Sequence, residues 1–430
     1  MRIIRYPQRS DWPLLCARPH LENQELAKTV GSVLADVREQ GDEAIKRYEE
    51  RFDHVKLESL VVSETEIDEA LTLVDEPLMV ALRQAHDNIA RFHNSQHFDS
   101  HVVETCAGVR CWQKSIAIEK VGLYIPGGTA PLFSTVLMLA TPARIANCKE
   151  IVLCTPPDKS GHVHPAILAA AHIAGVHKIF KVGGVQAIAA MAYGTESIPQ
   201  VYKIFGPGNQ YVMAAKQQVS VDTVAIDMPA GPSEVCVIVD ETSDSRFAAA
   251  DLLSQAEHGI DSQVILISTS ETKMKEIVEE TERQLSSLHR KEIAERSLNN
   301  SLFILVKDTD EAISLSNEYA PEHLILATAD YHSLADKVIN AGSVFMGRWA
   351  CESAGDYASG TNHTLPTHGW AKSYNGVNLD SFIRKVTFQE LSATGIDSIG
   401  KTVERMAAEE SLDAHCRAMT YRIAQRKSEL

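Results

Sequence analysis

The sequence predicts an α/β fold with two α/β units, a helical region before them and a helical tail after them. Three observations support this prediction. The chain has 430 residues, which is too long for one ordinary hydrophobic core and favours two principal domains. From Val121 onward, short apolar runs alternate with helical stretches, and glycine or proline stands at most junctions. This alternation is typical of parallel sheets with crossover helices, and it starts again after residue 230.

The composition is that of a globular cytoplasmic protein and excludes several functional classes. Hydrophobic residues make up 44% of the chain and charged residues 23%, as in ordinary soluble domains. The net charge of −16 provides no basic surface for nucleic acid or for an anionic membrane. The eight cysteines form no CxxC pair, so we expect reduced thiols in the cytoplasm. We also expect no signal peptide and no membrane span, because no apolar run is long enough and uninterrupted.

The N-terminal part, residues 1–115, is predicted to be an arm followed by a helical region. Within it, residues 22–97 space their apolar side chains three and four apart, which is the period of an amphipathic helix. Gly41 interrupts this pattern, so we expect a break there.

The first α/β domain is predicted over residues 116–230 and the second over residues 231–370. The strand-like runs of the first domain are VGLYI, EIVLCT, KIFKV and VYKIF. Those of the second are VCVIVD, QVILIS, LFILV, HLILAT and GSVFMG. The remaining residues, 371–430, lose the strand pattern and end in a predicted helix over about 403–428.

One stretch matches a phosphate-binding loop, GIDSIGKT at 395–402. A true loop of this kind follows a buried strand and has a flexible backbone whose N–H groups converge on phosphate. Here the preceding RKVTFQELSAT is a poor central strand, and two isoleucines stiffen the loop. We therefore interpret the stretch as the beginning of a helix.

A dinucleotide site is a better hypothesis, although the chain has no GxGxxG. Three strand ends run into glycine-rich turns, in LYIPGGTAP, KVGGVQAIA and IFGPGNQYV. Glycine lets backbone approach a ligand closely, and the following helices direct their N-terminal N–H groups toward it. Ligands in such sheets bind at the carboxyl ends of the strands. Ordinary strand-to-helix turns explain the same spacing, so both interpretations stay open.

A metal site is suggested by Gln255 and His258, which lie three apart in a helical pattern that Gly259 ends. Residues at this spacing share a helix face, so a glutamine oxygen and a histidine nitrogen could reach one ion. Asp356, in a polar loop, and His415, in the tail, are further candidates. Such a set of nitrogen and oxygen ligands suits zinc or a similar divalent ion. Spacing alone does not connect the four positions, and a histidine at a helix end is commonly a cap.

The chain has two Glu-His pairs. Glu257-His258 includes the candidate metal ligand, and Glu322-His323 lies at the start of the strand-like run HLILAT. Neighbouring side chains on a strand point to opposite sides, so the two are not expected to bind the same atom. Histidine is the usual general base, and a nearby glutamate can activate water. On the residues alone, an exposed glutamate beside a histidine half-buried at a strand start is the favoured interpretation.

Long blocks of the sequence resemble the histidinol dehydrogenase family. IDMPAGPSEV (226–235), SQAEHG, APEHLI and SAGDYASGTNHTLPT carry the resemblance, together with VGLYIPGGTAPLFSTVLMLATPARIA. The resemblance covers most of the chain. It implies oxidation of L-histidinol to L-histidine by way of L-histidinal, with two NAD and one zinc per site. The alternative is a paralogous zinc/NAD dehydrogenase acting on another small polar alcohol.

The resemblance also implies a role for individual residues. It places the zinc ligands at Gln255, His258, Asp356 and His415. It places the catalytic pair at Glu322 and His323, with Glu257 left as a structural residue. It places the substrate contacts at Ser233, Gln255, His258, His323, Asp356, Glu410 and His415, with His363 as an extra contact. It places the NAD contacts at Tyr124, Gln186 and Asn209, one in each glycine-rich turn.

The resemblance further implies incomplete Rossmann-like sheets, in keeping with the missing GxGxxG. It implies a homodimer whose tail crosses to the partner subunit, so that Glu410 and His415 complete the site of the neighbour. A ligand so distant in sequence from the others would then be explained. No nucleic acid and no membrane is expected as a partner.

Overall fold

The computed structural model describes residues 1–18, 24–127 and 130–429. Two residues of the predicted helical region, 22 and 23, lie outside the described residues, as do Gly128 and Thr129 of the first glycine-rich turn. The chain forms two compact units, one of residues 1–96 and 119–382 and the other of residues 97–118 and 383–430. Among the described residues, no helix combines the length and the apolar character needed to cross a membrane.

The first unit begins with short elements and long helices. These are β1 (Arg2–Arg5), α1 (Trp12–Leu15), α2 (Gln24–Tyr48), η2 (Glu49–Asp53), α3 (Glu64–Leu73) and α4 (Glu76–Asn94). The predicted break at Gly41 is confirmed, because this residue has a φ of 54° inside α2, which glycine adopts readily. Ser63 and Glu66 form a capping box that begins α3. The helical prediction for this region is confirmed in the described part.

The first sheet has five parallel strands in the order β6-β5-β4-β7-β8. The strands are β4 (Lys120–Tyr124), β5 (Glu150–Thr155), β6 (Lys178–Lys181), β7 (Lys203–Phe205) and β8 (Ala225–Ile226). Their helices are α5 (Phe133–Ile145), α6 (Pro165–Ile173), α7 (Gly184–Tyr193) and α8 (Gln210–Val219). Numbered along the chain, this order is that of a Rossmann sheet without its sixth strand. The predicted incomplete Rossmann-like sheet is therefore confirmed.

The second sheet repeats this order, with one strand added at its edge: β1-β11-β10-β9-β12-β13. Its strands are β9 (Glu234–Val239), β10 (Gln263–Ser268), β11 (Leu302–Leu305), β12 (His323–Leu326) and β13 (Ser343–Met346). Its helices are α9 (Ser245–Ala256), α10 (Glu271–Leu285), α11 (Lys291–Asn299), α12 (Thr309–Tyr319), α13 (Tyr331–Ala335) and α14 (Glu352–Tyr357). The added strand comes from the N-terminal arm, which pairs in parallel with β11.

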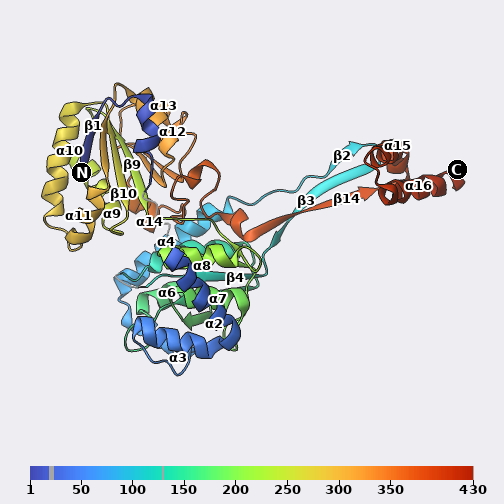
Figure 1. Cartoon of the computed structure of the whole chain (residues 1–430), viewed down its shortest axis with the longest axis horizontal. Helices are drawn as coiled ribbons and strands as arrows, with labels where there is room; N and C mark the ends of the chain where they lie inside the picture. The colour runs from blue at the N-terminus through green and yellow to red at the C-terminus, as the bar shows by residue number, and fades with distance from the viewer. Residues whose placement is uncertain (19–23, 128–129, 430) are drawn as a thin grey trace. The chain divides into compact units, whose positions relative to one another are not determined.

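Alternate residues of the second sheet enter two different hydrophobic cores. In β9, Val235, Val237 and Val239 pack with α9, α10 and α11, whereas Cys236 and Ile238 pack with α1, α12 and α13. Both faces of the strand are buried, which explains its continuous apolar sequence. Figure 1 shows helices on both sides of this sheet. The boundary predicted at residue 230 falls between β8 and β9 and stays a prediction.

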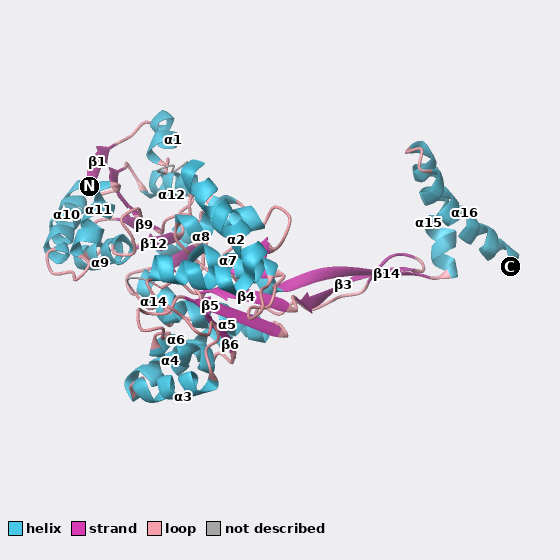
Figure 2. Ribbon diagram, turned by 60° about the horizontal axis from the view of Figure 1, so that its bottom comes forward, coloured by secondary structure: helices cyan, strands magenta, loops and turns pink. Residues whose placement is uncertain are grey.

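The second unit joins a three-stranded antiparallel sheet, in the order β14-β3-β2, to two helices. Its elements are β2 (Val103–Cys106), β3 (Val109–Ala117), β14 (Ile383–Leu391), α15 (Ala393–Glu409) and α16 (Asp413–Ser428). Figure 2 shows β3 and β14 side by side as a long ribbon. The expectation that residues 371–430 hold no strand is wrong. β14 has few buried side chains, so it lacks the apolar run of a core strand.

The second unit also shows whether residues 395–402 form a phosphate-binding loop. Residues 395–402 lie wholly inside α15, so they form no loop. The Oγ of Ser392 accepts the N–H of Gly395 and caps the helix. Gly400 lies against Ile423 of α16, which explains a glycine there by close helix packing. The interpretation of this stretch as a helix beginning is confirmed.

Candidate active site

Three side chains of the first unit form a cluster suited to a metal ion. His258, Glu352 and Asp356 each offer a ligand atom, and these atoms lie within 4.8 Å of one another. The side-chain amide of Gln255 lies against the carboxylate of Glu352, and with its NH2 group turned toward that carboxylate it donates to Oε2 at 3.1 Å. One imidazole nitrogen with amide and carboxylate oxygens is a ligand set that zinc accepts.

Two short helical segments position this cluster. α9 ends at Ala256, and the N–H of His258 donates to the carbonyl of Gln255 in the turn that follows. α14 carries Glu352 and Asp356 four residues apart, on one face of the helix. The structure thus brings together Gln255, His258 and Asp356, which spacing alone did not connect.

Glu352 is a candidate ligand that the sequence predictions missed. Its side chain is buried, and burial raises its pKa well above the ordinary range of a carboxyl group. An acidic residue one helical turn before Asp356 was a usable signal. The sequence predictions missed this spacing because they placed the segment in an irregular polar loop, whereas it forms a helix.

The predicted catalytic pair lies buried at the start of β12. Glu322 and His323 are 6% and 4% exposed, so the alternative of an exposed glutamate beside a half-buried histidine is wrong. β12 runs beside β9, with His323 in register with Val235. The pair therefore sits at the amino end of the sheet, unlike the glycine-rich turns at the carboxyl ends of the first sheet.

The backbone of Glu234, the first residue of β9, holds both members of the pair. Its N–H donates to Oε2 of Glu322 at 2.9 Å. Its carbonyl oxygen lies 3.2 Å from Nδ1 of His323, and because a carbonyl only accepts, this nitrogen donates. The other ring nitrogen, Nε2, faces Asp356. No protein hydrogen bond to that buried atom is formed among the described residues.

The catalytic pair and the metal cluster meet at Asp356. Nε2 of His323 lies 3.6 Å from Oδ1 of Asp356. Burial lowers the pKa of His323, but the carboxylates of Glu352, Glu322 and Asp356 outweigh burial and raise it to about 10. Burial raises the pKa of Glu322 to about 8. Acidic charge is therefore concentrated at the base, where a bound cation would offset it.

The other predicted substrate residues of the first unit border this site. Ser233 directly precedes β9 and is partly exposed, and its carbonyl accepts the N–H of Gln263. Nδ1 of His363 lies 3.0 Å from the backbone oxygen of Asp356. Its Nε2 lies 3.1 Å from Oγ1 of Thr135. Both ring nitrogens of His363 are thus engaged, and this histidine supports α14, the helix that carries Asp356.

The predicted cofactor residues lie at the carboxyl ends of the first sheet. Tyr124 and Gln186 are buried and share a polar cluster, in which the Tyr124 hydroxyl accepts the N–H of Gly184. Oε1 of Glu49 accepts the N–H of Gly183 and the Nε2–H of Gln186 at 3.0 and 2.9 Å. The sequence predictions missed Glu49, because it is distant in sequence from the turn that it supports.

The third predicted cofactor residue, Asn209, caps α8. Its Oδ1 accepts the N–H groups of Tyr211 and Val212. In the same turn, Gly206 is indispensable: a Cβ there would lie 2.1 Å from the backbone oxygen of Tyr124. The three turns thus lie at the carboxyl ends of β4, β6 and β7, on one edge of the same sheet, and nucleotide binding there stays a prediction.

Glu410 and His415 belong to the second unit. Glu410 is the C-cap residue that follows α15, and His415 lies in the first turn of α16. Their roles as substrate contact and metal ligand stay predictions, because each unit is described by itself.

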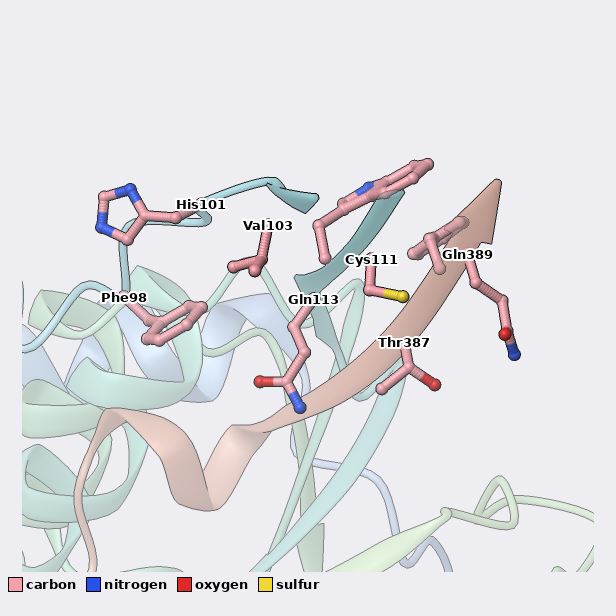
Figure 3. A pocket seen from close by; sticks show the side chains of 9 residues that line it. Phe98, His101, Val103, Cys111, Gln113, Thr387 and Gln389 are labelled. Carbon is pink, nitrogen blue, oxygen red and sulfur yellow. The ribbon is translucent and has the colours of Figure 1, made fainter. Parts of the chain in front are cut away.

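The second unit also carries a groove of about 580 Å³ on its ribbon, seen in Figure 3. Trp112 and Phe388 stack there with their ring centroids 5.6 Å apart. None of the predicted site residues lines this groove. Its lining consists of Phe98, His101, Val103, Cys111, Trp112, Gln113, Thr387, Phe388 and Gln389.

Comparisons with known proteins point to one family. The model of the family described as histidinol dehydrogenase matches residues 16–423. A histidinol dehydrogenase of Bacteroides fragilis is 62% identical over 423 residues, which cover 98% of this chain and 99% of that protein. One from Vibrio vulnificus is 51% identical over 404 residues, which cover 94% of this chain and 93% of that protein. The crystal structure of histidinol dehydrogenase from Elizabethkingia anophelis matches with a TM-score of 0.97 at 50% identity, covering 99% of this chain and 98% of that one.

Proposed function

Because the chain belongs to the histidinol dehydrogenase family and is an oxidoreductase, we propose that it oxidises L-histidinol to L-histidine by way of L-histidinal. The reaction uses two NAD and one zinc per site and completes histidine biosynthesis. The alcohol loses a hydride and a proton in the first step. The aldehyde takes up water, and its hydrate loses a second hydride and proton.

One observation carries this proposal: the proton-accepting atom of His323 lies 3.6 Å from the carboxylate of Asp356. A base beside a metal cluster is the arrangement that oxidation of a metal-held alcohol requires. Because Nδ1 donates to the carbonyl of Glu234, Nε2 is left to take the hydroxyl proton. The hydride then leaves the carbinol carbon for NAD, and no charge builds up on the oxygen.

The residues present fit a zinc ion. Gln255, His258 and Asp356 would hold it from the first unit, with Glu352 beside them. A bound zinc ion would supply a fixed positive charge for positioning the substrate. In the proposed homodimer, His415 of the partner subunit would be a further ligand, and the partner's Glu410 would contact the substrate.

Glu322 serves the second oxidation. Its pKa of about 8, raised by burial, lets the carboxyl group exchange a proton near neutral pH, as a general base requires. Glu322 takes a proton from water as the resulting hydroxide adds to the aldehyde carbon, and His323 returns the proton of the first step to the aldehyde oxygen, which gives the hydrate. His323 then accepts a hydroxyl proton of the hydrate as the second hydride leaves for another NAD.

A cysteine-based route is disfavoured by the environment of the buried thiols. Burial raises the pKa of Cys148 and of Cys236 to about 12, so neither is a thiolate at neutral pH. Burial also raises the pKa of Cys16 to about 11. We propose water as the nucleophile of the second step.

NAD is proposed to bind at the turns that carry Tyr124, Gln186 and Asn209. They follow β4, β6 and β7 at the carboxyl end of the first sheet, where nucleotides bind in such sheets. The enzyme is expected to work in the cytoplasm, without nucleic acid or membrane partners.

The test is metal removal and return. The purified protein is analysed for bound metal, treated with a chelator, and assayed for NADH formation from L-histidinol before and after zinc is restored. We expect activity to disappear with the metal and to return with zinc. Full activity without metal would refute the metal role. If the metal-loaded protein does not oxidise histidinol but oxidises another small alcohol, the alternative of a paralogous dehydrogenase would be favoured.

A further inference from the structure

The guanidinium group of Arg18, in the N-terminal arm, makes several contacts within the first unit. Its Nε and Nη2 donate to the two carboxylate oxygens of Glu234, each at 2.9 Å. Nη2 also donates to the backbone oxygen of Tyr319 at 2.7 Å. The guanidinium lies 3.8 Å from the centroid of the Tyr319 ring. The side chains of Arg18 and Glu234 are 10% and 2% exposed, so this ion pair is shielded from solvent.

Both partners of Arg18, Tyr319 and Glu234, are connected to the catalytic pair. Tyr319 is the last residue of α12, three residues before Glu322 in the chain. Glu234 begins β9, and its backbone N–H and carbonyl contact Glu322 and His323. Arg18 therefore fixes the segment that carries the pair and the residue whose backbone orients it. The N–H of His368 donates to Glu234 as well, at 3.0 Å, which further restrains the carboxylate.

We propose that Arg18 and Glu234 are positioning residues for the catalytic pair, an inference that rests on the function proposed above. Arg18 holds the Glu234 backbone where its carbonyl accepts Nδ1–H of His323 and its N–H donates to Glu322. The first contact selects the ring tautomer with a free Nε2. The second fixes the carboxylate that activates water. Arg18 is not interchangeable with lysine, because only a planar guanidinium donates to both carboxylate oxygens and to a carbonyl.

The test compares Arg18→Met and Arg18→Lys with Arg5→Met. Arg5 is the matched control, because it lies in the same arm and its ion pair with Glu271 is exposed, at 50% and 46%. We expect Arg18→Met to lower kcat about tenfold to a hundredfold, as misplacement of catalytic groups does. The KM for L-histidinol and the zinc content should stay at wild-type values, since neither contact touches a metal ligand. Arg18→Lys should recover part of kcat, and Arg5→Met should match the wild type.

A double-variant cycle separates positioning from stability. In the His323→Gln background, Arg18→Met should cause little further loss of kcat, because residues that act as a unit are not additive. A full additional loss in the double variant would overturn the proposal. So would unchanged kcat in an Arg18→Met protein that folds. If Arg18→Met does not fold, Glu234→Gln, which keeps the side-chain shape, replaces it in the same cycle. A wild-type protein that is inactive on histidinol would refute the proposed function instead.

Discussion

The Nε2 atom of His323 and the Oδ1 atom of Asp356 lie 3.6 Å apart, so the proposed proton acceptor and a proposed metal ligand share one site. In the proposed function, His258 and Asp356 hold the metal, whereas Glu322 and His323 move protons. The predictions below separate these roles.

Asp356→Asn is expected to weaken zinc binding by at least about tenfold, because it removes a charged ligand. The affinity is measured by competition with a chelator of known strength, on protein that retains its far-UV circular dichroism. Glu257→Gln is the control, since Glu257 is adjacent to His258 but lies outside the cluster. Equal loss in both variants would mean that general charge, and not ligation, determines the affinity.

Glu322→Gln is expected to slow the oxidation of L-histidinal by about a hundredfold or more, since a general base commonly contributes that much. The first oxidation should be far less affected, because the glutamine oxygen can still accept the N–H of Glu234. L-histidinol and L-histidinal are supplied separately, and NADH is followed in single turnovers. If the variant oxidised the aldehyde at the wild-type rate, Glu322 would not be the base that activates water.

Glu49 makes the stability of the protein depend on pH. Burial raises the pKa of its carboxyl group from 4.5 to about 7. The folded state then binds a proton that the unfolded state has released, so stability falls as the pH rises from about 4.5 to about 7. Between pH 5.5 and 8 this group removes about 2 kcal/mol from the free energy of unfolding.

Glu49→Gln abolishes that titration while keeping an oxygen for the N–H of Gly183. Urea unfolding of wild type and variant at both pH values measures the difference. Asp251, whose pKa burial also raises to about 7, titrates in both proteins and cancels in the comparison. Parallel pH dependences in the two proteins would contradict the assignment to Glu49.

Lys216→Met is expected to destabilise the protein by about 3 kcal/mol, the usual result of leaving a buried charge without its partner. Lys216 and Asp227 have side chains 1% and 2% exposed and lie 2.5 Å apart. Both also bind the backbone of Gly206, in the turn before Asn209. The double variant Lys216→Met/Asp227→Asn should recover part of the loss in chemical denaturation. A loss below about 1 kcal/mol in the single variant would show that Asp227 is not left isolated.

Much of the fold was predictable because the central strands are buried on both faces. Their apolar runs, and the turns that follow them, stand out in the sequence. β14 does not stand out in the sequence, because its side chains are mostly exposed or half-exposed and resemble those of a loop. The pairing of β1 with β11 depends on residues three hundred positions apart, and nothing local records it.

Individual candidate residues of the site were recognisable in the sequence, but their spatial arrangement was not. The spacing of Gln255 and His258 indicated a shared helix face, yet only the packing of α14 near α9 brings Asp356 to them. Glu352, Glu49 and Arg18 act through partners far away in sequence. Local patterns cannot reveal such partners, because tertiary packing alone creates the contact.

The most direct test counts the NADH formed from a limiting amount of L-histidinol with excess NAD. Two NADH per histidinol, with none formed after the zinc is chelated, is the result that the proposed function predicts. One NADH per histidinol would mean that the reaction stops at the aldehyde, which would contradict the role assigned to Glu322. No NADH from zinc-loaded protein would contradict L-histidinol as the substrate.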